Sequence, residues 1–271
     1  MLKQRLLRSL ARNRQSHLLR RLDRMCVRFH EAFENLDYDF RANGENFVLE
    51  TLSHQPEVRT ILDVGANVGD WAAMAAKSIP GAAIHSFEIV PETRERLREN
   101  CAPFANVHPH PFGLSEAPGE IEVYYAKDMN ANATCIEGIS EMFHKRHPPA
   151  VKARVTTGDR FCAEQGIGRI DFLKMDVEGF EPQVLRGFRA KLETGDVRMI
   201  QFEYGYVNIV VKFLLKDFYD FLAPYGMKIG KIYPDRVEFR DYDLHDENFL
   251  GPNYLAVHAS MQPLLADLAG R

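Results

Sequence analysis

The chain is poor in cysteine and has no pair of cysteines at a spacing typical of metal or redox sites. Its 271 residues include four cysteines, which lie far apart and form no C-x-x-C motif: Cys26, Cys101, Cys135 and Cys162. This pattern argues against a disulfide framework and a cysteine zinc site, and it is typical of free thiols in a reducing compartment. We therefore expect a cytoplasmic protein whose cysteines act as small buried apolar side chains.

Long apolar runs, internal repeats and low-complexity segments are also absent. No stretch approaches the roughly 20 apolar residues that a membrane-spanning helix needs. The basic start of the chain lacks the apolar core of a secretory leader, so none is expected. A hydrophobic content of 45% is nevertheless enough to form one large core.

A net positive charge is confined to the first 28 residues. Residues 1–28 contain nine Lys or Arg and one Asp, a net charge of +8, and the whole chain carries −4, so residues 29–271 carry −12. Phosphate binding requires a basic surface, so this acidic bulk argues against nucleic acid as a partner.

The basic segment also carries a helical pattern of apolar residues. Large apolar side chains recur there at mostly helical spacing: Leu2, Leu6, Leu10, Leu18, Leu22, Met25, Phe29 and Phe33. We predict a basic amphipathic helical extension over residues 1–37 and one domain over residues 38–271. The favoured interpretation is a helix packed on the domain with a solvated basic face. A peripheral contact with the inner face of an anionic membrane, a partner-docking arm and a dimer contact remain alternatives.

Short apolar strands alternate with helix-length segments through the rest of the chain. After a first strand near residue 62, strands are expected over 82–87, 107–112, 120–125, 152–157, 170–175, 198–202, 227–233 and 253–257. Helices are expected over 71–77, 91–100, 181–188 and 212–222. This alternation predicts an α/β fold with a doubly wound sheet.

A glycine-containing loop follows the first strand and indicates a nucleotide-sized ligand. Asp63 ends the strand, and the loop contains Gly65 and Gly69 with Asn67 between them. A dinucleotide motif would have a glycine at the middle position, and its pyrophosphate would be repelled by Asp63 and Asp70. Two carboxylates suit a ligand with a cationic amino group and ribose hydroxyls, which describes S-adenosylmethionine.

Acidic residues stand at or near the ends of four apolar strands: Asp63, Glu88, Asp176 and Glu203. Ligands of open α/β sheets bind at the carboxyl ends of the strands, so these acids are expected to converge on one site. Glu88 follows the glycine loop at about the 20-residue spacing of an acid that binds ribose hydroxyls.

The motif order resembles the FkbM-type family of S-adenosylmethionine-dependent methyltransferases. The matching segments include residues 62–70, 87–88, 113–115, 155–159, 171–181, 201–205 and 253–257, and the similarity extends from about residue 38 to 258. Gly158 departs from the family pattern, which often has an apolar residue there. The resemblance implies a class I methyltransferase, Rossmann-like, with a seven-stranded, mostly parallel sheet whose last strand is antiparallel.

The resemblance also implies roles for single residues. The methionine end of the cofactor and the turn would be held by Asp63, Gly65, Asn67 and Gly69. Glu88 would bind the ribose, Gly113 and Leu114 would lie beside the adenine, and Asn43 and Glu45 would close the site from the N-terminal side. We expect the acceptor to be contacted by Glu203, Tyr204, His144 and Thr134.

The reaction needs an acceptor oxygen aligned with the methyl–sulfur axis, and a base helps a weakly nucleophilic hydroxyl. Asp176 and Glu178 follow a central strand and are equal candidates for that base. Lys174 is either a buried lysine paired with an acid or a base of lowered pKa. No metal is expected, although Asp176, Glu178 and Glu203 leave Mg²⁺ open.

The predicted function is O-methyl transfer to a sugar hydroxyl of a glycan or glycolipid. A polyketide, peptide or lipid hydroxyl, an amine, and a non-catalytic cofactor-binding scaffold remain alternatives. The sequence does not predict the acceptor itself or the oligomeric state.

Overall fold

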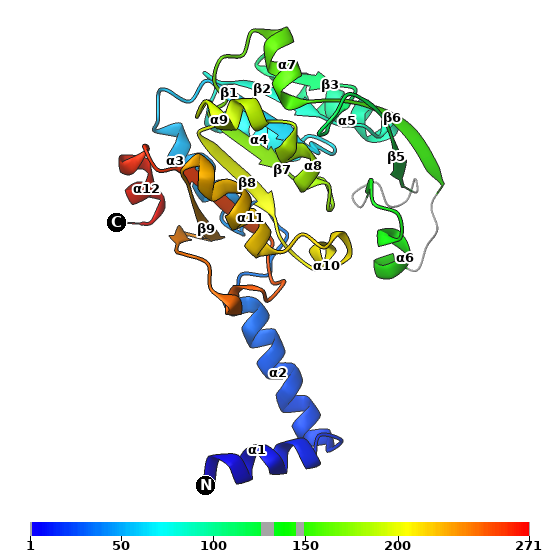
Figure 1. Ribbon diagram of the computed structural model, residues 1–271, viewed down its shortest axis with the longest axis vertical. Helices are drawn as coiled ribbons and strands as arrows, with labels where there is room; N and C mark the ends of the chain where they lie inside the picture. Colours follow the sequence, from blue (N-terminus) through cyan, green and yellow to red (C-terminus); the bar gives the residue numbers. More distant parts are fainter. Residues whose placement is uncertain (1, 126–132, 145–148, 271) are drawn as a thin grey trace.

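The computed structural model describes residues 2–125, 133–144 and 149–270, which form a three-layer α/β domain and a helical arm (Figure 1). The central sheet has eight strands in the order β10-β9-β11-β8-β7-β1-β2-β3. These strands are β1 (Thr60–Val64), β2 (Ala83–Phe87), β3 (Val107–His110), β7 (Phe172–Met175), β8 (Met199–Glu203), β9 (Met227–Tyr233), β10 (Arg236–Phe239) and β11 (Asn253–His258).

Strand direction follows the predicted class. Strands β3, β2, β1, β7 and β8 pair in parallel, and β11 lies antiparallel between β8 and β9. The α/β class and the antiparallel last strand are confirmed. The predicted number of seven strands is one too low, because β9 turns back into the antiparallel strand β10. That short strand carries Arg236 and Glu238 and buries Val237, so its sequence has no apolar run to indicate it.

Helices cover both faces of the sheet. One face carries α3 (Glu45–Ser53), α4 (Asp70–Ser78), α5 (Pro91–Cys101) and α12 (Gln262–Leu268). The other face carries α7 (Gly158–Gln165), α8 (Glu181–Arg186), α9 (Arg189–Glu193) and α11 (Leu215–Leu222). Each layer buries its apolar side chains against the strands between them, as expected for a doubly wound sheet.

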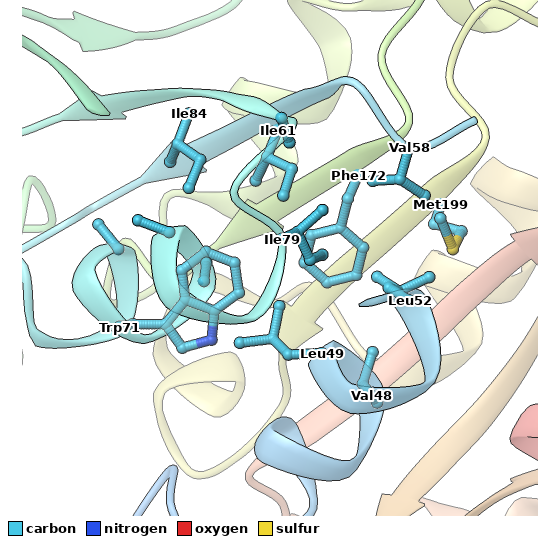
Figure 2. Close-up of a cluster of buried hydrophobic side chains, with 14 of the residues drawn as sticks. Val48, Leu49, Leu52, Val58, Ile61, Trp71, Ile79, Ile84, Phe172 and Met199 are labelled. Atoms are coloured by element: carbon cyan, nitrogen blue, oxygen red, sulfur yellow. The ribbon is translucent and has the colours of Figure 1, made fainter. Parts of the chain in front are cut away.

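The core under α3 and α4 fixes the central strands (Figure 2). Ile61 and Phe172 point to this face, whereas the next residue of each strand, Leu62 or Leu173, belongs to the core of the opposite face. The rings of Trp71 and Phe172 stack with centroids 5.9 Å apart. Burial of a large apolar side chain contributes roughly 1.5–3 kcal/mol, so this packing holds the ends of β1 and β7 in place.

A second, three-stranded sheet lies outside the central one. It comprises β4 (Gly113–Leu114), β5 (Gly119–Tyr124) and β6 (Ala150–Thr156) in the order β4-β6-β5. The strands predicted over 120–125 and 152–157 therefore form, and they pair with each other in an antiparallel ladder. Short helices follow at α6 (Ile139–His144), α10 (Val207–Val211), η2 (Ala223–Tyr225) and η3 (Leu244–Asp246).

The helix predicted over 212–222 begins later in the structure. Lys212 ends α10 in the left-handed conformation, with φ of 54°. The carboxylate of Asp217 then accepts a hydrogen bond of 2.7 Å from the backbone N–H of Leu214, and α11 starts at Leu215. The left-handed residue interrupts the backbone hydrogen bonds that a continuous helix would need.

The N-terminal arm consists of α1 (Leu2–Arg12) and α2 (His17–Phe33), which extend away from the domain (Figure 1). Helix α2 buries none of its residues, so the favoured interpretation of a helix packed on the domain is wrong. The arm is held where α2 ends, because Glu34 forms an ion pair of 2.7 Å with Lys231 of β9. Within the described ranges, no helix is long and apolar enough to span a bilayer.

Candidate functional site

The loop between β1 and α4 has the left-handed backbone that its glycines predict. The φ angles are 83° at Gly65, 48° at Asn67 and 85° at Gly69. A Cβ on Gly65 would lie 1.9 Å from the carbonyl oxygen of Asp176, so only glycine allows this close approach of the loops after β1 and β7. Gly69 caps α4 and packs against Leu97 of α5 instead of lining the site.

A first cavity opens beside this loop at the carboxyl ends of β1 and β2. Its lining contains five of the residues predicted to bind the cofactor, Gly65, Asn67, Glu88, Gly113 and Leu114. The rest is mostly apolar, from Val64, Phe87, Ile89, Ile121, Ala133, Cys135, Val155, Val177 and Phe180, with Asp176 and Glu178 at the remaining positions. An apolar cavity with a few polar groups is typical of a nucleoside site.

Glu88 supplies the carboxylate of the first cavity. It is buried at the end of β2, and its Oε1 accepts a hydrogen bond of 2.8 Å from the backbone N–H of Val90. Burial raises the pKa of Glu88 to about 7, although backbone N–H groups of Val90, Asn67 and Ile89 act in the opposite direction. A carboxylate in this position can accept hydrogen bonds from vicinal hydroxyls.

Asp63 is a buried carboxylate that few polar or charged groups of the protein stabilise. Its side chain is 0% exposed, and neither oxygen has a hydrogen-bond partner among the described residues. The nearest cation is Lys174, whose Nζ lies 3.9 Å from Oδ1. Burial raises the pKa of Asp63 to about 6, with Lys174 lowering it and Asp176 and Glu45 raising it. A cationic ligand group would relieve this cost.

A second cavity of about 470 Å³ adjoins the first at the ends of β7 and β8. Its lining is polar and acidic: Tyr38, Asn43, Glu45, Asp176, Glu178, Glu181, Glu203, Tyr206, Asn208 and Asn253, with Ile139, Gly179, Gly205, Val207 and Pro252. Asp176 and Glu178 line both cavities. A group bound in one cavity therefore meets a group bound in the other at these two carboxylates.

Lys174 lies beneath the shared carboxylates. Its Nζ is 3.0 Å from Oδ2 of Asp176 and 5.5 Å from the ring centre of Trp71. Burial alone would lower the pKa of Lys174, but the carboxylates of Asp176, Asp63 and Glu45 raise it above the ordinary value. Of the two predicted interpretations, the geometry favours the buried ammonium paired with acids over the neutral base.

Glu178 occupies a tight turn directly after β7. Its φ is 52°, and its carbonyl oxygen accepts a hydrogen bond of 2.9 Å from the hydroxyl of Thr134. Burial raises the pKa of Glu178 to about 8, and the charges of Asp176 and Glu181 add to that effect. Thr134, predicted to contact the acceptor, is thus placed where it fixes the backbone of Glu178.

The other acids of the second cavity repel one another. Burial raises the pKa of Glu203 well above its ordinary value, and the charges of Asp176, Glu178 and Glu181 act in the same direction. The pKa of Glu181 rises to about 7 for the same main reason. Within the part of the chain that is described, no group of three or more His, Cys, Asp and Glu residues is arranged to hold a metal ion.

Asn43 and Glu45 lie along the second cavity, whereas we predicted them near the cofactor. Glu45 is buried, and its Oε1 accepts hydrogen bonds from the amides of Asn43, at 3.1 Å, and Asn253, at 2.9 Å. Gln201 donates to its other oxygen at 2.7 Å. This network ties the segment before α3 to the ends of β8 and β11.

Tyr204 and His144 were also predicted to contact the acceptor, but neither is placed in the second cavity. Tyr204 is fully buried, donates a hydrogen bond of 2.6 Å to Glu247 and stacks on Phe249, so the structure places it in the core. His144 ends α6, but its side chain lies outside the described part of the structure.

The prediction missed several residues that line the second cavity: Tyr38, Glu181, Tyr206, Asn208 and Asn253. Glu181 lies within the matched segment 171–181, so its acidic type was a usable signal. Asn253, the first residue of β11, likewise lies within the matched segment 253–257. Tyr38 precedes α3, and Tyr206 and Asn208 stand at the start of α10, where the sequence has no pattern of its own.

Comparison with known proteins identifies the family of this domain. A family model described as "Methyltransferase FkbM domain" matches residues 63–229, more than half of the chain. The chain belongs to this family. The predicted family and cofactor are thereby confirmed, and the matched segment is an S-adenosylmethionine-dependent methyltransferase domain.

Two curated relatives are similar at a moderate level. The hexuronic acid methyltransferase AglP of Haloferax volcanii is 29% identical over 60% of this chain and 64% of its own length. The 2-O-methyltransferase NoeI of Sinorhizobium fredii is 29% identical over 54% of this chain and 63% of its own length. The chain thus spans slightly less than two thirds of each relative.

Among solved structures, a methyltransferase FkbM from Methylobacillus flagellatus matches with 14% identity and a TM-score of 0.46. The match covers 77% of this chain and 48% of that one.

Proposed function

We propose that this protein transfers the methyl group of S-adenosylmethionine to a hydroxyl group of a sugar, in a glycan or glycolipid. The observation that carries this proposal is the sharing of Asp176 and Glu178 between the two cavities. The donor cavity and the acceptor cavity meet where a carboxylate can take a proton from the attacking oxygen.

The residues of the first cavity fit the cofactor. Asp63 lines neither cavity, but it is a buried carboxylate without a hydrogen-bond partner among the described residues, and we propose that it pairs with the ammonium of the methionine group when the cofactor binds. Glu88 would accept hydrogen bonds from the ribose hydroxyls, and Gly113 and Leu114 would pack beside the adenine. When bound, the cofactor supplies an activated methyl group on a sulfonium.

Glu178 is the better candidate for the base. The carboxylate of Asp176 already accepts a hydrogen bond from the Lys174 ammonium at 3.0 Å, so one of its oxygens is engaged before any acceptor binds. Glu178 has a pKa raised to about 8, so its carboxylate binds a proton strongly once it is ionised. Asp176 and Lys174 would then form an ion pair beside the reacting atoms.

The second cavity suits a sugar ring better than an apolar acceptor. Its lining offers two tyrosines, Tyr38 and Tyr206, together with amides and carboxyl groups that can hydrogen-bond to several hydroxyls. One relative is named for hexuronic acid and another for 2-O-methyl transfer. Because the cavity itself is acidic, we propose a neutral sugar in place of a hexuronate.

Other acceptors and a non-catalytic role fit less well. A polyketide or lipid hydroxyl would leave many polar groups of the second cavity without partners. A scaffold that only binds cofactor would not need a second acidic cavity. The four free thiols support our proposal of a cytoplasmic location.

The test is a methyl-transfer assay with matched neutral and anionic acceptors. The protein is incubated with S-adenosylmethionine and either a hexoside or the corresponding hexuronide, and both S-adenosylhomocysteine and the methylated sugar are quantified. We expect transfer to the hexoside and much slower transfer to the hexuronide. No transfer to any glycoside by protein that binds the cofactor would contradict a sugar acceptor.

A further inference from the structure

The arm exposes a continuous apolar stripe on each of its helices. On α2, Leu18, Leu22, Met25 and Phe29 follow one another at intervals of four, three and four residues, so they share one face. All four are exposed, and Phe29 is exposed by 72%. Isolated exposed apolar residues are ordinary, but a row of them along a helix marks a contact surface.

Helix α1 has the same division into faces. Leu6 and Leu10 are four residues apart on one side and are exposed, at 60% and 42%. Arg5, Arg8 and Arg12 occupy the other side at intervals of three and four residues. The helix contains no acidic residue.

Basic residues form the opposite face of α2 as well. Arg20, Arg24 and Arg28 recur every four residues, away from the apolar stripe. Together with α1 and the turn between the helices, residues 1–28 reach a net charge of +8, whereas residues 29–271 carry −12. The positive charge of the chain is therefore concentrated on the same two helices that carry the apolar stripes, on their opposite faces.

We propose that the arm binds the surface of an anionic lipid bilayer and attaches the methyltransferase domain to it. A bilayer interface provides a partner for each face of the arm. Its apolar interior can take up the leucine and phenylalanine side chains, and its anionic headgroups can pair with the arginines. Two arms of separate copies would instead bring two charges of +8 together, so charge complementarity favours lipid over a contact between two arms.

The base of the arm is fixed to the wall of the acceptor cavity. Asn35, just after α2, donates hydrogen bonds to the carbonyl oxygens of Asn43, at 2.7 Å, and Ile232, at 3.0 Å. Asn43 and the nearby Tyr38 line the acceptor cavity. A bound arm would thus hold that cavity close to the lipid surface, which, if the proposed function holds, points to a lipid-linked sugar as acceptor.

Flotation of the chain of residues 1–271 with vesicles tests the proposal without any need for activity. The probes are phosphatidylcholine vesicles with and without phosphatidylglycerol. We expect binding to the anionic vesicles that weakens as salt is added, and little binding to phosphatidylcholine alone. In the variant Arg5→Gln/Arg8→Gln/Arg12→Gln, affinity should fall roughly a hundredfold, because each basic residue near an anionic surface contributes a factor of about five.

A matched control separates position from net charge. The variant Arg96→Gln/Arg98→Gln/Arg189→Gln removes the same charge from exposed sites of the domain and should bind like the wild type. The variant Leu6→Ser/Leu10→Ser keeps the charge of the arm but should lose roughly tenfold or more per leucine. The melting temperature of the domain should be unchanged in all arm variants, because the substituted residues of α1 are all exposed.

Two results would overturn the proposal. One is absence of binding to anionic vesicles by the folded chain of residues 1–271. The other is a stable dimer in sedimentation that becomes a monomer in the variant Leu6→Ser/Leu10→Ser, while the wild type and this variant bind vesicles equally. The second result would assign the stripes to a contact between copies.

Discussion

At the scale of single residues, the site contains buried carboxyl groups whose ionised form is unfavourable. Burial raises the pKa of Asp63 to about 6 and of Glu88 and Glu181 to about 7. An acid whose folded pKa is raised binds protons more tightly when folded, so its ionisation destabilises the fold. We predict that the melting temperature of the cofactor-free protein falls as pH rises from about 4 to 8, which a thermal scan across that range measures.

Asp63→Asn should separate stability from cofactor binding. At pH 8 the variant without cofactor should be more stable by roughly 1–3 kcal/mol, because a buried charge is removed. Its affinity for S-adenosylmethionine should fall roughly ten- to a hundredfold through loss of the charge-assisted contact. Chemical denaturation and calorimetry measure the two effects.

The control for this pair of effects is Asp171→Asn. Asp171 is also buried, but it accepts hydrogen bonds from the backbone N–H groups of Arg59, at 2.8 Å, and Thr60, at 3.0 Å. It should lose stability and keep its cofactor affinity. Equal behaviour of the two variants would remove Asp63 from the donor site.

Glu178→Gln should lower kcat by roughly 10²–10⁴ and leave cofactor affinity almost unchanged, because a general base acts only in the reaction. In the wild type, kcat/KM should rise with pH with a midpoint near 8, since the carboxylate must be ionised to accept a proton. The midpoint for kcat should lie lower, because a cation in the neighbouring cavity favours the carboxylate. A pH–rate profile of both proteins measures this.

Asp176→Asn is the matched variant for the choice between the two candidates. It should retain a rise of kcat/KM with pH that belongs to Glu178, with the midpoint moved to lower pH because the charge of Asp176 raises the pKa of Glu178. If Glu178→Gln kept the wild-type kcat and Asp176→Asn lost it, Asp176 would be the base.

At the scale of elements, the glycine loop depends on its contact with the loop after β7. Gly65→Ala places a Cβ 1.9 Å from the carbonyl oxygen of Asp176 and forces a φ of 83° on alanine. We expect a loss of roughly 2–4 kcal/mol of stability together with loss of activity, because Asp176 must move. Denaturation and transfer assays measure both.

Gly119→Ala is the control for that substitution. A Cβ on Gly119 would contact nothing within 4 Å. This variant should be close to wild type in both stability and activity, and a loss equal to that of Gly65→Ala would contradict the steric explanation.

The elements that sequence could predict are those with strong apolar periodicity or a short-range motif. Strands such as β7, with burial at every position, and the glycine loop were predictable because their signal is local. Strand β10 and the late start of α11 were not, because the first depends on pairing with β9 and the second on the left-handed Lys212.

At the scale of the whole molecule, the two cavities combine local and long-range information. Gly65, Asn67 and Glu88 line one cavity together, the one that we propose holds the donor, because they belong to one strand–loop–helix segment and the end of the next strand. The acceptor cavity was less predictable: Tyr38 and Asn253 come from opposite ends of the chain and meet only through the fold. The same reasoning explains why Tyr204 was misplaced, since its neighbour Glu203 faces the cavity and adjacent strand residues point to opposite sides.

The central claim is that the first cavity holds S-adenosylmethionine through Asp63 and presents it to Glu178. Calorimetric titration of the folded wild type and of Asp63→Asn with the cofactor and with S-adenosylhomocysteine tests it most directly. The account predicts binding of both ligands to the wild type. It also predicts that Asp63→Asn loses more affinity for the cofactor than Glu178→Gln does, because Asp63 would pair with the cofactor's amino group. No affinity of the folded wild type for either ligand would contradict the account.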